Sequence, residues 1–194
     1  MDSDNIQGFW RDKHDPHRYL RANPARTGAL VDAVNALKLD CPAVLEIGCN
    51  SGRNLFGLWD AGYRDLTGIE INPEAIRLLR ETRPDCTIAT IPHAVEDIIQ
   101  QLPSRHFDVV FTMAVLLHLP PSSEWVFAEM ARISAHYIIT VECETSRLKT
   151  ADMVQRHWRR NYRTVFEALG MRQLDVQNGP GDLSKYVLRV FERK

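Results

Sequence analysis

The sequence predicts an α/β fold, a doubly wound sheet that is mainly parallel and carries an antiparallel hairpin at its C-terminal end. Short apolar runs alternate with segments of helical periodicity, as in folds built from repeated strand–helix–strand units. The last two apolar runs are joined by too few residues for a helical crossover, so we expect them to pair antiparallel. The 194 residues suffice for one domain, which we place at residues 25–194 behind a polar segment of residues 1–24.

Five apolar runs lack the polar alternation of half-buried strands, which is typical of parallel strands covered on both faces. These runs are Ala43–Ile47, Leu66–Ile71, Cys86–Ile91, Phe107–Thr112 and His136–Val141. Helical periodicity precedes, separates and follows them at Ala25–Leu39, Arg53–Ala61, Pro73–Thr82, Ala94–Leu102, Pro121–Ile133 and Ala151–Leu169. The hairpin strands are Met171–Gln177 and Ser184–Phe191, joined by Asn-Gly-Pro-Gly. We therefore expect a Rossmann-like sheet.

The composition argues against several classes of protein. A formal net charge of -1 and a pI of about 6.7 provide no general attraction for nucleic acid or anionic membranes. No apolar run approaches the roughly 20 residues that span a bilayer. The polar N-terminus does not resemble a secretory signal, so we expect a cytoplasmic protein. The four cysteines form no CxxC pair and no zinc-finger spacing, so we expect reduced thiols and no metal.

The segment Val44–Asn54 carries the strongest chemical signal. A buried strand leads into a tight turn with Gly48 and Gly52, and a helix starts at once. Glycine removes the Cβ that would block a ligand and permits positive φ, while backbone N–H groups at the helix start can face a polar ligand group. Eighteen residues after Gly52, Glu70 ends the second strand, where a carboxylate can accept both hydroxyls of a ribose. Turn and acid together indicate an adenosine-type ligand.

The pattern Glu-x-Gly-x-Asn-x-Gly at 46–52 resembles the first motif of class I S-adenosylmethionine-dependent methyltransferases, type 11/12-like. Glu70 matches that family's ribose-binding acid, and Phe107–Pro120 resembles its fourth-strand motif, so the resemblance covers residues 40–192. Asn50 stands where the family usually has a glycine, but Asn tolerates left-handed backbone. The turn is also similar to small methyltransferases of bacterial surface-sugar pathways, including pseudaminic acid biosynthesis.

A nicotinamide dinucleotide is the competing ligand. Its fingerprint, Gly-x-Gly-x-x-Gly, would place glycines two and five residues after Gly48, where the sequence has Asn50 and Arg53. An arginine at the last position would obstruct the close helix–strand packing for which that glycine is used. The resemblance therefore implies S-adenosylmethionine as the cofactor.

The resemblance also implies the residues that hold this cofactor. They are Glu46, Gly48, Cys49, Asn50, Gly52, Glu70, Ile71, His93, Ala94 and Met113. Two details stay open. After the third strand, either His93 meets the adenine edge beside Ala94, or His93 caps the helix and Glu96 or Asp97 meets the adenine. Arg53 either binds the methionine carboxylate or covers the adjacent surface.

Methyl transfer is an in-line displacement, so a base is needed only where the acceptor must lose a proton. His118 lies just beyond the fourth strand, and the ordinary pKa of histidine, near 6.5, suits proton removal at neutral pH. Glu142 ends the fifth strand, where its side chain can face the acceptor. Each has a structural alternative, because His118 can pack its helix and charged residues gather at strand ends.

The N-terminal segment contains Trp10, His14 and Tyr19. In the family that the motifs resemble, such segments often fold over the cofactor as a lid, which would supply aromatic and cationic contacts to the acceptor. The alternative is a loosely docked tail.

Basic residues crowd residues 147–163. On a helix, Arg159 and Arg160 would share one side with Arg156 and Arg163 and could bind a phosphate, a sugar nucleotide or a carboxylate. The alternative is a solvated helix face.

These expectations define one function. The chain is expected to transfer a methyl group from S-adenosylmethionine to a small molecule, at an oxygen of a sugar-like or anionic metabolite. The alternatives are RNA or protein methylation, and a catalytically silent methyltransferase-like subunit that binds a partner. The intact set of Gly48, Gly52 and Glu70 argues against the silent subunit.

Overall fold

The structure of the chain is a computed structural model that describes residues 3–13, 15–20, 24–144, 157–179 and 185–194. The described residues form a seven-stranded sheet with the order β3-β2-β1-β4-β5-β7-β6. The strands are β1 (Val44–Ile47), β2 (Leu66–Ile69), β3 (Ala89–Ile91), β4 (Phe107–Met113), β5 (Ser134–Glu142), β6 (Met171–Asn178) and β7 (Val187–Arg193). The first five strands pair in parallel, and β7 is antiparallel to β5 and β6. The predicted sheet and its C-terminal hairpin are confirmed.

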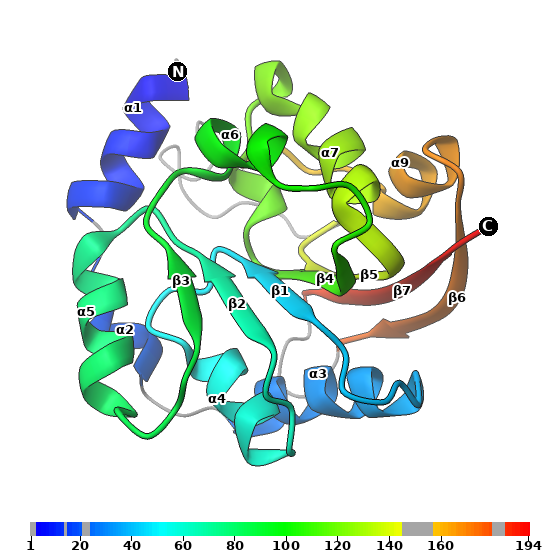
Figure 1. The fold of residues 1–194 in the computed structure, drawn as a ribbon. Coiled ribbons are helices and arrows are strands. Elements are labelled where there is room, and N and C mark those ends of the chain that lie inside the picture. The colour runs from blue at the N-terminus through cyan, green and yellow to red at the C-terminus, as the bar shows by residue number, and fades with distance from the viewer. Residues whose placement is uncertain (1–2, 14, 21–23, 145–156, 180–184) are drawn as a thin grey trace.

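Helices cover both faces of this sheet (Figure 1). One face carries α3 (Pro24–Ala36), α4 (Arg53–Asp60) and α5 (Pro73–Thr82), and the other carries α6 (Val95–Ile98), α7 (Trp125–Ile133) and α9 (Tyr162–Ala168). Strand β1 shows why two layers are needed, because Val44 enters one hydrophobic core and Leu45 enters the other. Both side chains are at most 1% exposed. Apolar runs without alternation therefore are strands buried on both faces.

Short 3-10 helices replace parts of two predicted α-helices. The predicted helix Ala94–Leu102 consists of α6 followed by η2 (Ile99–Gln101). The predicted helix Pro121–Ile133 begins as η4 (Pro121–Ser123) before α7. A third 3-10 helix, η3 (Leu116–His118), follows β4 and, as described below, helps to line the site.

The predicted helix Ala151–Leu169 is wrong for residues 157–161. Residues 157–160 are not helical, and α9 starts only at Tyr162. The reason is Asn161, which has extended backbone and accepts a hydrogen bond from the Thr164 amide through its side chain, so it caps a new helix. Residues 151–156 lie outside the described part of the chain.

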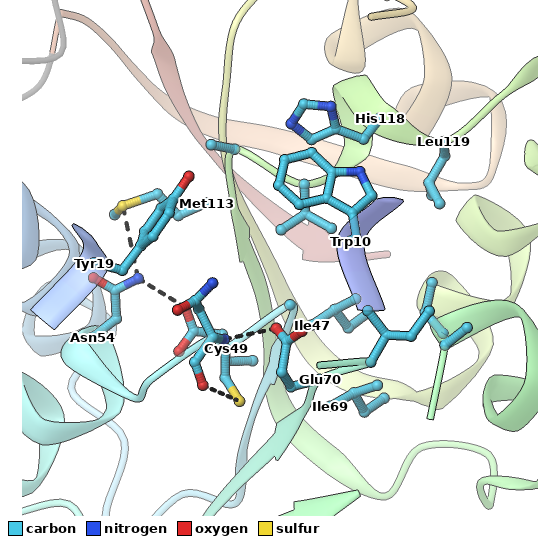
Figure 2. A pocket seen from close by; sticks show the side chains of 18 of the residues that line it. Trp10, Tyr19, Ile47, Cys49, Asn54, Ile69, Glu70, Met113, His118 and Leu119 are labelled. Carbon is cyan, nitrogen blue, oxygen red and sulfur yellow. Dashed lines mark hydrogen bonds between the residues drawn. The ribbon is translucent and has the colours of Figure 1, made fainter. Parts of the chain in front are cut away.

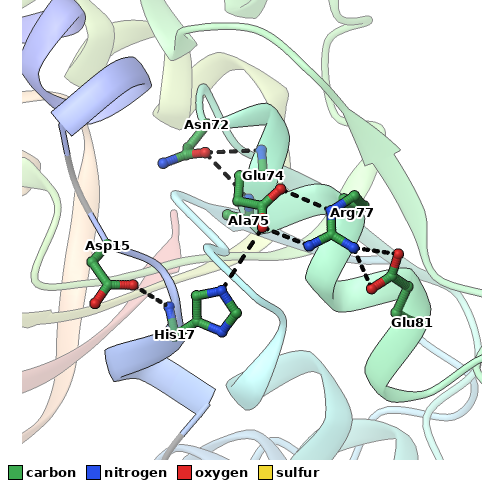
Figure 3. A network of polar contacts seen from close by, with 7 residues as sticks. All are labelled: Asp15, His17, Asn72, Glu74, Ala75, Arg77 and Glu81. Carbon is green, nitrogen blue, oxygen red and sulfur yellow. Dashed lines mark hydrogen bonds and ion pairs between the residues drawn. The ribbon is translucent and has the colours of Figure 1, made fainter.

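The N-terminal segment contains more helix than its sequence predicts. Its elements are α1 (Ser3–Gly8), the π-helical turn η1 (Phe9–Lys13) and α2 (His17–Leu20). It contacts the start of α5: Nδ2 of Asn72, the N-cap of α5, donates to the Trp10 carbonyl at 3.2 Å. Figure 3 shows a second contact, in which His17 Nε2 lies 3.8 Å from Glu74 Oε1. Within the described ranges, no helix combines the length and the apolar character needed to cross a membrane.

Candidate cofactor and acceptor site

A cavity lies at the edge of the sheet where the parallel strands end (Figure 2). Its walls come from the loops after β1, β2, β3 and β4, from η3, and from the N-terminal segment. Of the predicted cofactor residues, Gly52 alone does not line it. Ligands of doubly wound sheets bind at this edge, so the location agrees with the sequence-based prediction.

The turn after β1 has left-handed backbone at Gly48, Asn50 and Gly52, with φ of 72°, 50° and 85°. Asn50 therefore adopts the conformation expected of it, and its Oδ1 accepts the Ser51 amide at 2.8 Å. The expected reason for the glycines needs correction, because the missing Cβ atoms face protein rather than ligand. A Cβ at Gly48 would lie 2.5 Å from Val115, and one at Gly52 would lie 2.7 Å from Leu79.

Glu70 follows β2 with its carboxylate held by the neighbouring backbone. Oε2 accepts the Asn50 amide and Oε1 accepts the Asn72 amide, both at 2.8 Å. The residue is 7% exposed, and burial raises the pKa of its carboxyl group. Each oxygen accepts one amide and has a second lone pair. This orientation within the cavity wall suits a pair of ribose hydroxyls.

Glu46 lies deeper, in β1, and is 1% exposed. Its Oε1 accepts from Asn54 Nδ2 at 2.7 Å, whereas its Oε2 has no hydrogen-bond partner among the described residues. Burial raises the pKa of this carboxyl group to about 8. A buried acceptor oxygen at a cavity wall fits a cationic ligand group, such as the ammonium of a methionine moiety.

The loop after β3 places His93 and Ala94 in the cavity wall. Ala94 is the N-cap of α6 and no side chain caps this helix, so the alternative in which His93 caps it is wrong. Glu96 also lines the cavity, and its Oε1 accepts from Ser123 Oγ at 3.2 Å. Asp97 is exposed and lies outside the cavity wall. Contact of adenine with His93 or Glu96 stays a prediction.

The end of β4 and the start of α4 meet at Met113. Arg53 Nη2 lies 3.5 Å from Met113 Sδ, and Asn54 Nδ2 lies 3.7 Å from the same sulfur atom. Both Met113 and Arg53 line the cavity, so Arg53 does not merely cover the outer surface.

The two candidate bases have different surroundings. His118 lines the cavity, and its ring centroid lies 4.4 Å from that of Trp10 and 4.7 Å from that of His157. Glu142 is fully buried and outside the cavity wall, and its carboxylate accepts the amides of Val115, Leu116 and Leu117 at 3.0, 3.1 and 3.4 Å. The prediction of Glu142 as a base is therefore wrong: it anchors η3, which carries His118.

Residues 44–136 match the model of a family described as a methyltransferase domain. The chain contains a methyltransferase domain. Together with the fold, this match confirms the sequence-based resemblance to class I S-adenosylmethionine-dependent methyltransferases, and with it the predicted cofactor. The likeness to surface-sugar enzymes stays a prediction.

Solved structures of similar fold include methyltransferases with bound cofactor product. Magnesium protoporphyrin IX methyltransferase from Synechocystis, with bound S-adenosylhomocysteine, has a TM-score of 0.77 at 15% identity, over 99% of each chain. A Burkholderia thailandensis 1,6-didemethyltoxoflavin-N1-methyltransferase has a TM-score of 0.71 at 14% identity, over 99% of this chain and 86% of the other.

A curated relative, the tRNA U34 carboxymethyltransferase of Methylococcus capsulatus, is 31% identical over 78 residues. The match covers 39% of this chain, and it spans about a quarter of the relative's length, 24%.

The N-terminal segment closes part of the methyltransferase site. Ile6, Gln7, Trp10 and Tyr19 line the cavity, so two of the three residues predicted to contact the acceptor, Trp10 and Tyr19, lie in its wall, and their contact with an acceptor stays a prediction. His14 lies outside the described residues.

Arg159, Arg160 and Arg163, which are the basic residues of this segment within the described part of the chain, do not line the cavity, so the prediction is wrong for Arg159 and Arg160. The side chain of Arg160 is 9% exposed. Its guanidinium donates to Glu124 Oε1 at 2.8 Å and to the Leu119 carbonyl at 2.9 Å, so it fixes the chain after η3. The predicted common helical side is absent because residues 159 and 160 precede α9, and Arg156 lies outside the described residues.

The cavity wall also contains Arg26 and Tyr186, which the sequence analysis did not single out. Tyr186 directly precedes β7, whose antiparallel direction brings its start to the edge where the parallel strands end. The predicted antiparallel strand Ser184–Phe191 includes Tyr186, so the sequence could have placed this residue at the same edge. Arg26 lies in the first turn of α3, and no motif marks it.

No group of three or more His, Cys, Asp or Glu side chains in the described part of the chain is arranged to hold a metal ion.

Proposed function

We propose that this chain transfers the methyl group of S-adenosylmethionine to a small molecule, with an oxygen atom as the acceptor. The observation that carries the proposal is the shared cavity wall, in which the N-terminal segment and the cofactor residues face the same space. Trp10 illustrates this, because its ring packs against His118 with the two planes tilted by 57°, and its carbonyl accepts a hydrogen bond from Asn72, two residues after Glu70. An acceptor in such a cavity must be small enough to fit beneath this segment.

The residues fit the cofactor group by group. When bound, S-adenosylmethionine supplies a methyl group already activated on a sulfonium sulfur. Glu70 would accept from the ribose hydroxyls, and the unpartnered Glu46 Oε2 would accept from the methionine ammonium. Arg53 would pair with the methionine carboxylate, and Met113 would provide a polarisable wall near the sulfonium.

His118 is the side chain of this site best placed to take a proton from a hydroxyl acceptor. It lines the cavity from η3, and the carboxylate of Glu142 holds the backbone of that element in place. An imidazole can accept a proton near neutral pH, which a hydroxyl nucleophile must lose as its bond to the methyl carbon forms. A carboxylate acceptor would not need this step.

Methyl transfer to RNA is a second candidate function, because the curated relative is named as a tRNA-modifying enzyme. The match spans 78 residues, so it includes less than half of this chain. A catalytically silent, partner-binding role is the third candidate, and it predicts that cofactor binds without turnover or does not bind.

Isotope-labelled S-adenosylmethionine distinguishes these functions. The protein and the labelled cofactor would be incubated together in three separate reactions, one with a metabolite extract, one with total tRNA and one with a protein extract. We expect label in one small molecule, at an oxygen identified by mass spectrometry. Label in tRNA or protein, or no label in any fraction, would contradict the proposal.

The variant Glu70→Ala serves as the control for cofactor recognition. It removes acceptors of charge-assisted hydrogen bonds, so S-adenosylhomocysteine should bind at least about tenfold more weakly in calorimetry. Glu81→Gln, an exposed carboxylate on α5, should bind like the wild type. An unchanged affinity of Glu70→Ala would refute the ribose assignment.

A further inference from the structure

The element that carries His118 is a single turn of 3-10 helix, η3, which has three residues. An isolated turn of this length is unstable in water, because few hydrogen bonds offset the entropy that is lost when its backbone is fixed. The position of the turn must therefore be set by contacts from other parts of the chain. Two charged side chains, Glu142 and Arg160, make such contacts at opposite ends of η3.

Glu142 binds the amide end of this turn. Its Oε1 accepts the amides of Val115 and Leu116 at 3.0 and 3.1 Å, and its Oε2 accepts that of Leu117 at 3.4 Å. The residue is fully buried and ends β5, which lies between β4 and β7 in the sheet. The carboxylate is therefore a rigid support, because it cannot move without displacing a central strand.

Arg160 binds the carbonyl end of the same turn. Its Nη1 donates to the Leu116 carbonyl at 3.3 Å, and its Nη2 donates to the Leu119 carbonyl at 2.9 Å. The Trp158 amide donates to the Leu117 carbonyl at 2.7 Å, and Arg160 Nη1 also donates to the Trp158 carbonyl at 2.9 Å. One guanidinium therefore joins η3, the residue after it and the chain just before α9.

The two charges match the polarity of the turn. Peptide N–H groups at the start of a helical turn carry partial positive charge, and carbonyl groups at its end carry partial negative charge. Burial raises the pKa of the Glu142 carboxyl group to about 7, while the three amides favour its ionised form. Above that pH a carboxylate meets the N–H end and a guanidinium meets the carbonyl end, and hydrogen bonds with an ionised partner are stronger than those between neutral groups.

We propose that Glu142 and Arg160 act together as positioning residues for methyl transfer: they hold η3 from both ends and thereby set where the His118 imidazole lies in the cavity. This inference rests on the proposed function, because the place of that ring has a chemical consequence only where it takes a proton from the acceptor. Neither Glu142 nor Arg160 lines the cavity, so both act through the turn.

The ring of His118 can report its own position. Its centroid lies 4.4 Å from that of Trp10 and 4.7 Å from that of His157, and Figure 2 shows it beside the Trp10 ring. The ring current of an indole shifts the NMR signal of a nearby proton by an amount that depends steeply on distance and angle. A displacement of η3 should therefore move the signal of the His118 Hε1 proton, and no acceptor is needed to see it.

The wild type and each variant would be compared at pH 8, saturated with S-adenosylhomocysteine. Glu142→Gln is nearly isosteric but turns an amide group toward backbone N–H groups, and Arg160→Gln removes the guanidinium fork. We expect both to move the Hε1 signal, identified by its loss in His118→Gln, by more than its linewidth. Arg160→Gln alone carries the test if Glu142→Gln does not fold, because Arg160 lies outside the sheet.

Two variants with similar chemistry elsewhere are the matched controls, Glu144→Gln and Arg132→Gln. Glu144 also follows β5, and its side chain is 5% exposed and paired with Arg189 at 2.7 Å. Arg132, like Arg160, donates to two backbone carbonyls, those of Leu102 and Ile99. Both controls should leave the imidazole signal in place.

Turnover of the acceptor found by isotope labelling gives a second readout. We expect Glu142→Gln and Arg160→Gln to lower kcat about tenfold or more, because a misplaced base loses its alignment with the acceptor. Arg160→Lys should lose less, since it keeps the charge but not the fork. The affinity for S-adenosylhomocysteine should stay within about twofold of the wild-type value, and the double variant should lose less than the product of the two single losses.

The two readouts separate this inference from the proposed function. If the His118 signal or kcat is unchanged in both Glu142→Gln and Arg160→Gln, the inference fails while a labelled acceptor keeps the proposed function. Equal losses of kcat in the two controls would also overturn it, because the effect would then be a general loss of stability. If no acceptor is labelled, the proposed function fails, and the His118 signal alone decides whether the two side chains set the place of the ring.

Discussion

In the cofactor-free protein, burial raises the pKa of the Glu46 carboxyl group from 4.5 to about 8, so this group is mostly protonated at neutral pH. In the unfolded chain the same group ionises near 4.5, so between pH 4.5 and 8 the folded state binds a proton that the unfolded state has lost. The free energy of unfolding must therefore fall as the pH rises through this window, with a contribution from Glu46 of at most about 1.4 kcal/mol per pH unit.

We predict that Glu46→Gln stabilises the cofactor-free protein at alkaline pH. The Gln carbonyl oxygen can still accept from Asn54, but it never ionises. The difference in free energy of unfolding between variant and wild type should be small at pH 5 and should grow steadily toward pH 8 in urea titrations. Glu81→Gln, on the exposed surface of α5, should show no such trend. A difference that shrinks as the pH rises would contradict the raised pKa.

At the scale of elements, the glycines of the turn after β1 allow close packing against neighbouring side chains. Gly52 has φ of 85° and space for no Cβ, since Leu79 would lie 2.7 Å away. Gly170, after α9, has nearly the same φ of 84° but nothing within 4 Å of its missing Cβ. The two positions separate backbone strain from steric overlap.

We predict that Gly52→Ala lowers the free energy of unfolding more than Gly170→Ala. Left-handed strain costs about 1–2 kcal/mol at either position, and overpacking adds about 1–3 kcal/mol at Gly52 alone. Thermal and urea unfolding would measure both, and the double variant Gly52→Ala/Leu79→Ala should show positive coupling because the overlap is relieved. Equal losses at both glycines would mean that the ligand, not Leu79, imposes the requirement.

The N-terminal segment is the second element whose role can be tested. We predict that Trp10→Ala lowers kcat/KM for the methyl acceptor about tenfold, because the ring that packs against His118 also lines the cavity. Affinity for S-adenosylhomocysteine should change much less. Trp125→Ala is the matched control, since Trp125 is 38% exposed on α7 and away from the cavity. Kinetics as in the wild type for Trp10→Ala would support a docked tail.

For the molecule as a whole, the sequence allowed the sheet, and the cavity wall around the glycine turn and Glu70, to be predicted. Both depend on local patterns: apolar runs reveal buried strands, and the turn with Glu70 lies on two adjacent strands. The acceptor end was harder, because its side chains meet only through tertiary packing. Glu142 shows the limit, since its position at a strand end was clear, but whether its carboxylate faced the cavity or three backbone amides was not.

The prediction that Arg159 and Arg160 bind the acceptor was wrong for a related reason. The helix predicted from periodicity over 151–169 contained Asn161 as an interior residue. In the structure Asn161 is the N-cap of α9, so Arg159 and Arg160 precede this helix. Arg160 donates hydrogen bonds to the carbonyl groups of Leu116, in η3, and Leu119, just after it, and helical spacing does not predict such contacts. Arg26 lacked any motif because one arginine in a helical first turn is ordinary.

The antiparallel direction of β7 affects the stage of translation at which the cavity can form. Tyr186 lies in the same cavity wall as Trp10 and Tyr19, although more than 160 residues of chain separate them. The strands β1 to β5 can pair while the chain is still being synthesised, but this wall requires translation to pass Tyr186. A nascent chain that stops before Tyr186 therefore lacks one side of the cavity, and this side is added only after all five parallel strands have been synthesised.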